Sequence, residues 1–237
     1  MITLPLRAQL IIDTLKTAGF EAYAVGGSIR DLVLGKETKG WDFTTIATPE
    51  EILNVFPDSF YDNQFGTVGV KIRAKDTDSV EDVYEITTYR SEKGYSDKRH
   101  PDTITWGKTL LDDLSRRDFR MNAIAFDGKK IVDPYGGQAD ISNKRIQTVG
   151  DPSGRFSEDA LRLLRAVRFA AQLGFTIEEH TASAIVQHSQ LLTNISAERI
   201  RDEFMKILVS SHAADAILVL KNVGLLRHIL PDLEISF

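Results

Sequence analysis

A glycine pair followed at short spacing by charged residues carries the first chemistry visible in this sequence. A short apolar run ends at Gly26-Gly27, and the helix predicted after it carries Arg30 and Asp31. Glycines between a strand and a helix let backbone N–H groups approach an anion, and the start of the helix adds partial positive charge. Asp42 falls on the next predicted strand, where a carboxylate can hold a divalent cation beside that anion. A phosphate and a metal ion held together is the arrangement of phosphoryl or nucleotidyl transfer.

Further polar residues at two other places fit the same chemistry, each with an ordinary alternative. Glu85 lies in an alternating strand pattern, either as a solvent-facing side chain or as a second carboxylate that pairs with Asp42 across the sheet. Arg117 follows another arginine, and the pair is either a surface ion-pair patch or a planar, bidentate contact to a triphosphate. In the second interpretation, Asp118 and Asn122 orient a ribose.

A third group of charged residues lies in a helix predicted over residues 157–173. Asp159, Arg162 and Arg165 follow one another at intervals of three residues, so they are expected near one another on one helix face. A salt-bridged, solvated face is one interpretation. In the other, aspartate accepts and arginine donates hydrogen bonds to the edge of a cytosine or adenine base, as a complementary strand would.

Composition limits the class of protein. The chain of 237 residues is 42% hydrophobic, which is enough for one or two packed domains. Its net charge of −5 argues against indiscriminate nucleic-acid binding, so such contacts must come from local basic clusters. No apolar run approaches a membrane span, and the N-terminal segment is an amphipathic helix, not a signal sequence. The absence of cysteine excludes disulfides and thiolate zinc sites and fits a cytoplasmic protein.

The elements that must position these residues alternate between strand and helix up to about residue 140 and are helical afterwards. Strands are expected at 21–25, 41–46, 65–72, 83–88 and 103–106, with a hairpin at 125–132 and a polar loop at 90–101. Helices are expected at 4–18, 28–34, 48–55, 110–123, 157–173, 178–190, 196–209 and 212–223. We predict an α+β domain over residues 1–140, with a mixed sheet and flanking helices, and an all-α domain over residues 141–237.

Taken in order, the motifs resemble the bacterial-type (class II) CCA-adding tRNA nucleotidyltransferases and their poly(A) polymerase relatives, in the polymerase β-like nucleotidyltransferase superfamily. Residues 26–31 with Asp42 are similar to the catalytic motif of that family, and residues 116–123 to its ribose and triphosphate motif. Residues 158–162 are similar to its amino-acid template for CTP and ATP. Further members of the resemblance are nucleotide-contacting arginines at Arg165 and Arg168 and a helix-bracing motif at residues 195–200.

The resemblance implies template-independent addition of C, C and A to the 3′ end of tRNA from CTP and ATP, with Mg²⁺ in a two-metal site. It implies a nucleotidyltransferase head, a helical neck and the start of a body. Asp97 and Arg99 lie in a segment similar to the family's flexible loop, which favours CCA or A addition over CC addition. A CC-adding or poly(A)-adding relative and a nucleotide- or RNA-binding pseudoenzyme are the alternatives, and the oligomeric state stays open.

The sequence departs from the resembled motifs in three places. The metal motif of the family is Asp-x-Asp, whereas this chain has Gly40 before Trp41-Asp42, so we expect strongly impaired catalysis with nucleotide binding retained. Arg120 stands where the family has a small hydroxyl residue, either as a phosphate contact or as a solvent-facing side chain. The family continues past this chain into body and tail helices, so we expect lower tRNA affinity because phosphate contacts along the acceptor stem and elbow are missing.

Overall fold

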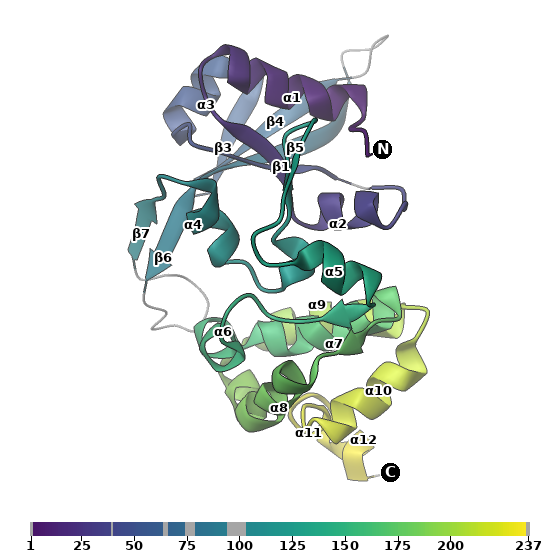
Figure 1. The fold of residues 1–237 in the computed structure, drawn as a ribbon. Helices are drawn as coiled ribbons and strands as arrows, with labels where there is room; N and C mark the ends of the chain where they lie inside the picture. Colours follow the sequence, from purple (N-terminus) through teal and green to yellow (C-terminus); the bar gives the residue numbers. More distant parts are fainter. Residues whose placement is uncertain (1, 39, 64–65, 74–78, 94–102, 236–237) are drawn as a thin grey trace. The chain divides into compact units, whose positions relative to one another are not determined.

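The computed structural model describes residues 2–38, 40–63, 66–73, 79–93 and 103–235. The chain divides into two compact units, which are traced in sequence colours in Figure 1. The first unit comprises Met1–Glu92, Ile104–Arg117 and Met121–Gln138, and the second comprises Lys93–Thr103, Asp118–Arg120 and Ala139–Phe237. Within the described residues, the chain has no helix that is both long enough and apolar enough to cross a membrane.

The first unit is built on a seven-stranded mixed sheet with the order β3-β4-β5-β2-β1-β8-β9. Its strands are β1 (Ala22–Val25), β2 (Asp42–Thr45), β3 (Ser59–Asn63), β4 (Thr67–Arg73), β5 (Val80–Thr88), β8 (Ala125–Phe126) and β9 (Ile131–Val132). Neighbouring strands are antiparallel except for β2 and β5, which are parallel. The central strands bury Phe43 and Ile86. The expected pairing of the strands near residues 65–72 and 83–88 and the expected hairpin at 125–132 are confirmed, whereas β3 was not expected.

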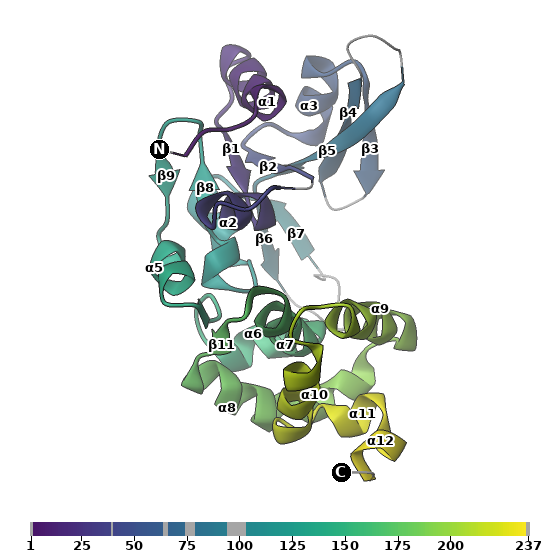
Figure 2. The ribbon, with the colours of Figure 1, turned by 90° about the vertical axis from the view of Figure 1, so that its right-hand side faces the viewer.

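The helices of the first unit are α1 (Leu6–Thr17), α2 (Gly27–Val33), α3 (Pro49–Val55) and α4 (Leu110–Ser115). Helices α1 and α3 lie side by side on one face of the sheet in both ribbon views (Figures 1 and 2). The expected start of α3 is confirmed, because Thr48 and Glu51 form a reciprocal capping box. Helix α1 buries Ile11, Ile12 and Leu15, while Leu6 and Leu10 are exposed.

Two further local expectations around the candidate residues were wrong. Residues 90–93, expected as loop, form strand β6 (Arg90–Lys93), which pairs with β7 (Thr103–Trp106) in a small separate sheet. The helix expected over 110–123 ends at Ser115, and a 3₁₀ turn follows at Arg120–Asn122. The chain leaves the helical path there because the Asp118 carboxylate accepts the backbone N–H of Phe119, whose side chain is fully buried.

The second unit is mainly helical. Its helices are α6 (Pro152–Glu158), α7 (Leu161–Leu173), α8 (Glu179–His188), α9 (Ala197–Leu208), α10 (Ala213–Asn222), α11 (Leu226–Ile229) and α12 (Pro231–Ile235). Helix α7 packs on α9 and α10 and buries Leu163, Leu164 and Val167. Two short strands, β10 (Arg145–Ile146) and β11 (Thr176–Ile177), pair in parallel. We expected a purely helical region here, and these strands show that it is not.

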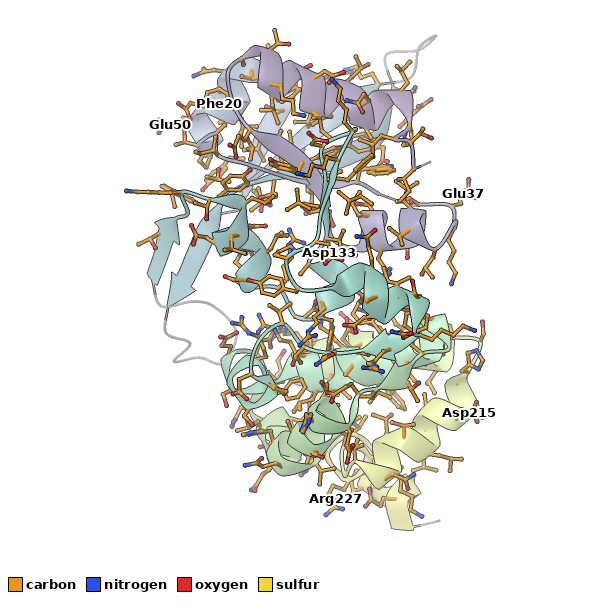
Figure 3. All side chains as sticks on the ribbon, viewed as in Figure 1. Phe20, Glu37, Glu50, Asp133, Asp215 and Arg227 are labelled. Carbon is orange, nitrogen blue, oxygen red and sulfur yellow. The ribbon has the colours of Figure 1, made fainter. Side chains whose placement is uncertain are left out.

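Helix α5 (Gly137–Ser142) lies in the turn-rich connector that follows β9. The carboxylate of Asp133, which is labelled in Figure 3, accepts the backbone N–H groups of Gly137 and Gln138 at 2.7 and 2.9 Å. This side chain therefore caps the first free N–H groups of the helix, as helix starts require.

Candidate functional site

Asp42 and Glu85 lie opposite one another on the parallel strands β2 and β5. The register pairs the Cα of Asp42 with that of Glu85, and on the other side pairs Asp42 with Val25 at the end of β1. Alternate side chains of a strand point to opposite faces, so Phe43 and Ile86 are buried while both carboxylates are exposed. The register therefore places the two acidic residues side by side on one face of the sheet.

The turn between β1 and α2 brings Gly26 close to two charged groups. Gly26 has a φ of 77°, a conformation that favours glycine. A Cβ at this position would lie 3.0 Å from Arg117 Nη1 and 3.5 Å from Asp42 Oδ2. Because Gly26 has no side chain, its backbone lies close to both the Arg117 guanidinium and the Asp42 carboxylate.

Arg30 is held by two hydrogen bonds on the first unit. Its Nε donates to Asp31 Oδ1 at 2.8 Å, and its Nη1 donates to Asn122 Oδ1 at 2.9 Å. A Cβ at Gly27 would lie 3.6 Å from Arg30 Nη2, so the guanidinium lies against the start of α2. The neighbouring predicted residues Gly27 and Arg30 are therefore adjacent to Asn122, which comes from a distant part of the sequence.

The electrostatics of Asp42 follow from its surroundings. The residue as a whole is exposed at the end of β2, but its Oδ2 lies against the turn at Gly26. Partial loss of water there raises the pKa of Asp42 above its ordinary value, and the positive charge of Arg117 opposes that rise. The carboxylate is therefore held in an environment that does not favour its own charge. A cation beside Asp42 would favour the charged form of this carboxyl.

We expect Asp42→Asn to increase thermal stability at neutral pH. A carboxyl whose pKa is raised by folding contributes stability that is complete below its unfolded pKa of about 4 and is lost as the pH rises through the raised folded value. Asparagine does not titrate, so the melting temperature of the variant should exceed that of the parent at about pH 7, with the difference closing toward about pH 3. Thermal unfolding across this range measures it.

The control for this measurement is Asp215→Asn, because Asp215 is exposed on α10 of the second unit (Figure 3). It should show no comparable gain at neutral pH. A less stable Asp42→Asn protein at neutral pH would contradict the assignment of Asp42 as a destabilised carboxylate.

In the second unit, Asp118 and Arg165 form a close ion pair. Arg165 Nε and Nη2 donate to Asp118 Oδ2 at 2.8 and 2.5 Å, and the side chain of Asp118 is only 8% exposed. Burial would lower the pKa of Arg165, but the charge and hydrogen bonds of Asp118 outweigh it and raise the pKa. The structure therefore brings these two predicted residues together as mutual partners.

The predicted single helix over residues 157–173 was wrong, and so was the common face of Asp159 and Arg162. Helix α6 ends at Glu158, and Asp159 has extended backbone angles of −140° and 105°. Asp159 Oδ2 accepts from Arg199 Nη2 of α9 at 3.0 Å, while Arg162 Nη1 donates to Glu158 at 2.6 Å. The break arises because the Asp159 carboxylate also accepts the N–H of Leu161 at the start of α7.

Arg168 on α7 pairs with a buried carboxylate of another helix. Its Nε lies 2.5 Å from the buried carboxylate of Glu203, and its guanidinium lies 4.1 Å from the ring centre of Phe169. Burial and the nearby charge of Arg165 lower the pKa of Arg168. Glu203 was not singled out in the sequence, because nothing local connects it with a residue of another helix.

The remaining predicted positions give simpler outcomes. Arg120 Nε donates to the carbonyl of Thr148 at 3.3 Å. Asp97 and Arg99 lie outside the described residues. Asp113 was also missed, although Arg116 and Arg117 follow it at three and four residues, which is the spacing at which helical side chains meet.

Comparison with known families gives two matches along the chain. Residues 22–147 match the family described as the poly A polymerase head domain, and residues 174–236 match a probable RNA- and SrmB-binding site of polymerase A. A CCA-adding enzyme of a Geobacillus species is 46% identical over 225 residues, which cover 94% of this chain and 54% of that relative. A CCA-adding enzyme of Lactobacillus helveticus is 44% identical over 229 residues, which cover 96% of this chain and 55% of that relative.

Solved structures give the same likeness. The CCA-adding enzyme of Bacillus stearothermophilus in complex with CTP has a TM-score of 0.82 and 41% identity, and covers 92% of this chain and 52% of that one. The Thermotoga maritima CCA-adding enzyme complexed with tRNA has a TM-score of 0.78 and 25% identity. The match covers 95% of this chain and 52% of that one. The predicted fold class and family resemblance are confirmed. The chain spans about half the length of the relatives that it matches.

Proposed function

This chain belongs to the poly A polymerase head-domain family, and from that premise we propose that it is a tRNA nucleotidyltransferase that adds CCA, or the terminal A, from CTP and ATP. The names of its relatives, CCA-adding enzymes, support this choice. Structures of similar enzymes with CTP and with tRNA support the proposed substrates. Because those substrates are tRNA and nucleoside triphosphates, the proposed compartment is the cytoplasm.

The observation that carries the proposal is the pair of carboxylates beside the glycine turn. Asp42 and Glu85 are neighbours across the strands, and Gly26 and Arg117 lie next to Asp42. In the proposed reaction, the 3′-hydroxyl oxygen of tRNA attacks the α-phosphorus of the triphosphate, and the bond to pyrophosphate breaks. Arg117 and the backbone at Gly26 and Gly27 bind the triphosphate, and Glu85 is placed to accept the hydroxyl proton.

The donor set fits a magnesium ion that takes its other ligands from substrate and water. Among the described residues, no group of three or more histidine, cysteine or acidic side chains gathers as a metal site. Mg²⁺ needs less, because it commonly binds through one or two carboxylates together with substrate phosphates and water. Asp42 would hold it, with Glu85 adjacent. When bound, the ion supplies positive charge to the triphosphate and lowers the pKa of the attacking hydroxyl.

Gly40 weakens this site in the proposed enzyme. It lies two residues before Asp42, at the position where the resembled motif has its other aspartate. With one carboxylate fewer, two cations would be poorly compensated. We propose that this chain binds nucleotide normally and transfers it slowly. The same position motivates the second candidate function, a nucleotide- or RNA-binding pseudoenzyme.

Residues of the second unit are assigned to recognition of the nucleotide. Asp159 and Arg162 are proposed to read the base, and Arg199 supports this by holding the Asp159 carboxylate. Asp118 and Arg165 act as a pair, so either one contributes to a ribose or phosphate contact only while oriented by the other. In the first unit, Arg30 and Asn122 are hydrogen-bonded to each other and are proposed to contact the nucleotide.

The test is incubation with a tRNA that lacks its 3′-terminal CCA, with each triphosphate singly and with CTP and ATP together. We expect slow addition of C from CTP alone, and of terminal A only when both are present, because the template residues select C and A. A sequencing gel gives the added residues in order.

Other products would identify the alternatives. An end at CC with both nucleotides present indicates a CC-adding enzyme, and a long run of A indicates a poly(A)-adding one. Binding of CTP or ATP with no incorporation, even at high Mg²⁺ or Mn²⁺, would replace the enzyme by the pseudoenzyme. Arg117→Ala should weaken triphosphate binding in either case.

A further inference from the structure

Asp113 is a buried charge at the end of α4 that holds two arginines. Its side chain is fully buried. Oδ1 accepts from Arg116 Nε and Nη2 at 3.0 and 2.6 Å, and Oδ2 accepts from Arg117 Nη2 at 3.0 Å. Burial would raise the pKa of Asp113, but the two guanidinium groups outweigh it and lower the pKa. The residue is therefore a permanent anion at neutral pH, with one oxygen for each arginine.

The other nitrogens of Arg117 indicate what this anchor does. Nη1 lies 3.0 Å from the place of a Cβ at Gly26, beside Asp42 Oδ2. Nε is buried and has no hydrogen-bond partner among the described residues. Asp113 is thus the group to which Arg117 donates, while the end of the guanidinium that faces the glycine turn is left to act on something else.

Without this anchor, Arg117 would not stay at the turn. Arginine loses considerable rotamer freedom when it is held in one position, and a neutral residue 113 would leave two neighbouring cations without their shared anion. The Arg117 side chain would then relax toward solvent.

We propose that Asp113 is a positioning residue that aims the Arg117 guanidinium at the triphosphate beside Gly26, while Arg116 neutralises the other oxygen of the same carboxylate. This inference rests on the proposed function, in which Arg117 contacts the phosphates. It assigns to Asp113 no contact with substrate. A change at Asp113 should therefore alter only the binding of the phosphates, and only through Arg117.

The test compares the binding of CTP and of CMP, measured by calorimetry, in Asp113→Asn, Arg117→Ala and the double variant. One charge-assisted hydrogen bond is at stake, so Asp113→Asn should weaken CTP binding by about tenfold to 100-fold and leave CMP binding unchanged. In the Arg117→Ala background, the same change should have no further effect on CTP. Asp112→Asn is the matched control, because within the described part of the chain the Asp112 side chain accepts only from Lys108 and Thr109, at the start of α4.

Two results would overturn the inference alone. One is an equal loss of CTP and CMP binding in Asp113→Asn, which a purely structural role produces. The other is a loss of CTP binding in Arg117→Ala with none in Asp113→Asn. If Arg117→Ala itself leaves CTP binding unchanged, the proposed phosphate site fails as well. Should Asp113→Asn not fold, the double change Asp113→Asn/Arg116→Gln removes one of the two uncompensated cations and tests the same CTP-to-CMP ratio.

Discussion

Gly40→Asp is expected to raise the incorporation of CMP and AMP into truncated tRNA by at least about 100-fold, since loss of the outer-shell partners of a metal site alone costs roughly 10–100-fold. The reason is electrostatic. A second carboxylate two residues from Asp42 adds a ligand and a negative charge where the proposed reaction concentrates cations and phosphate. Initial rates at saturating CTP, with and without ATP, measure the gain.

The backbone at Gly40 can accept this change. Among the described residues other than its chain neighbours, none has an atom within 4 Å of the place where a Cβ would be added, so these residues leave room for the new side chain. The φ of 76° is left-handed, which costs an L-residue about 1–2 kcal/mol, and aspartate is among the residues that visit this region most readily. The expected price in stability is therefore small compared with the gain in rate.

Gly40→Asn is the matched control, because it has the same shape and the same backbone cost without the charge. It should remain as slow as the parent. Equal incorporation by the parent and Gly40→Asp would show that the missing carboxylate does not limit this chain, and the proposed impairment would be abandoned.

Asp118→Asn is expected to destabilise the second unit by about 2 kcal/mol, or roughly 10 °C in melting temperature, because the buried Asp118 loses the charge that accepts two hydrogen bonds from Arg165. The side chain of Arg165 is 32% exposed, so water compensates part of the loss. The asparagine oxygen can still accept the N–H of Phe119, so the change isolates the ion pair from the turn. Thermal unfolding followed by circular dichroism measures the loss.

The control is Asp202→Asn, whose pair with Arg201 is exposed by 59% and 68% and should contribute less than about 1 kcal/mol. The double variant Asp118→Asn/Arg165→Met should recover part of the loss, since removing both charges of a partly buried pair costs less than removing one. If Asp118→Asn lowers the melting temperature no more than the control does, the ion pair does not stabilise the second unit. A role in orienting substrate would then better explain why Asp118 and Arg165 lie so close together.

The parts of this protein that were predictable from sequence depend on neighbours along the chain. The capping box of Thr48 and Glu51 formed as expected, and so did the hairpin over 125–132, because each is specified within a few residues. The glycine turn at Gly26 is of the same kind, since its positive φ is a local property. Charge spacing also contained the Asp113 pairs, although they were not recognised.

The pairing of the charged residues was decided by tertiary structure. Asp118 is joined to Arg165, 47 residues away, and Asp159 to Arg199, 40 residues away. Periodicity predicted that Asp159 lies on the same helix face as Arg162. In the structure, its carboxylate instead accepts hydrogen bonds from Arg199 and from the N–H of Leu161, which the fold brings close to it. A helix pattern cannot predict that competition, because propensity is weak beside a buried charge–charge contact.

The sequence by itself therefore determined the family, the change from a mixed α+β region to a mainly helical one, and the types of residue available for nucleotidyl transfer. Only the tertiary structure decided that Asp42 stands beside Glu85, because strand register is a property of the whole sheet and a shift of one residue would turn a side chain to the other face. It also decided which arginines Asp118 and Asp159 hold. The physical reason is the same in both cases: local propensities act between neighbours in sequence, whereas charges and strand ladders act between neighbours in space.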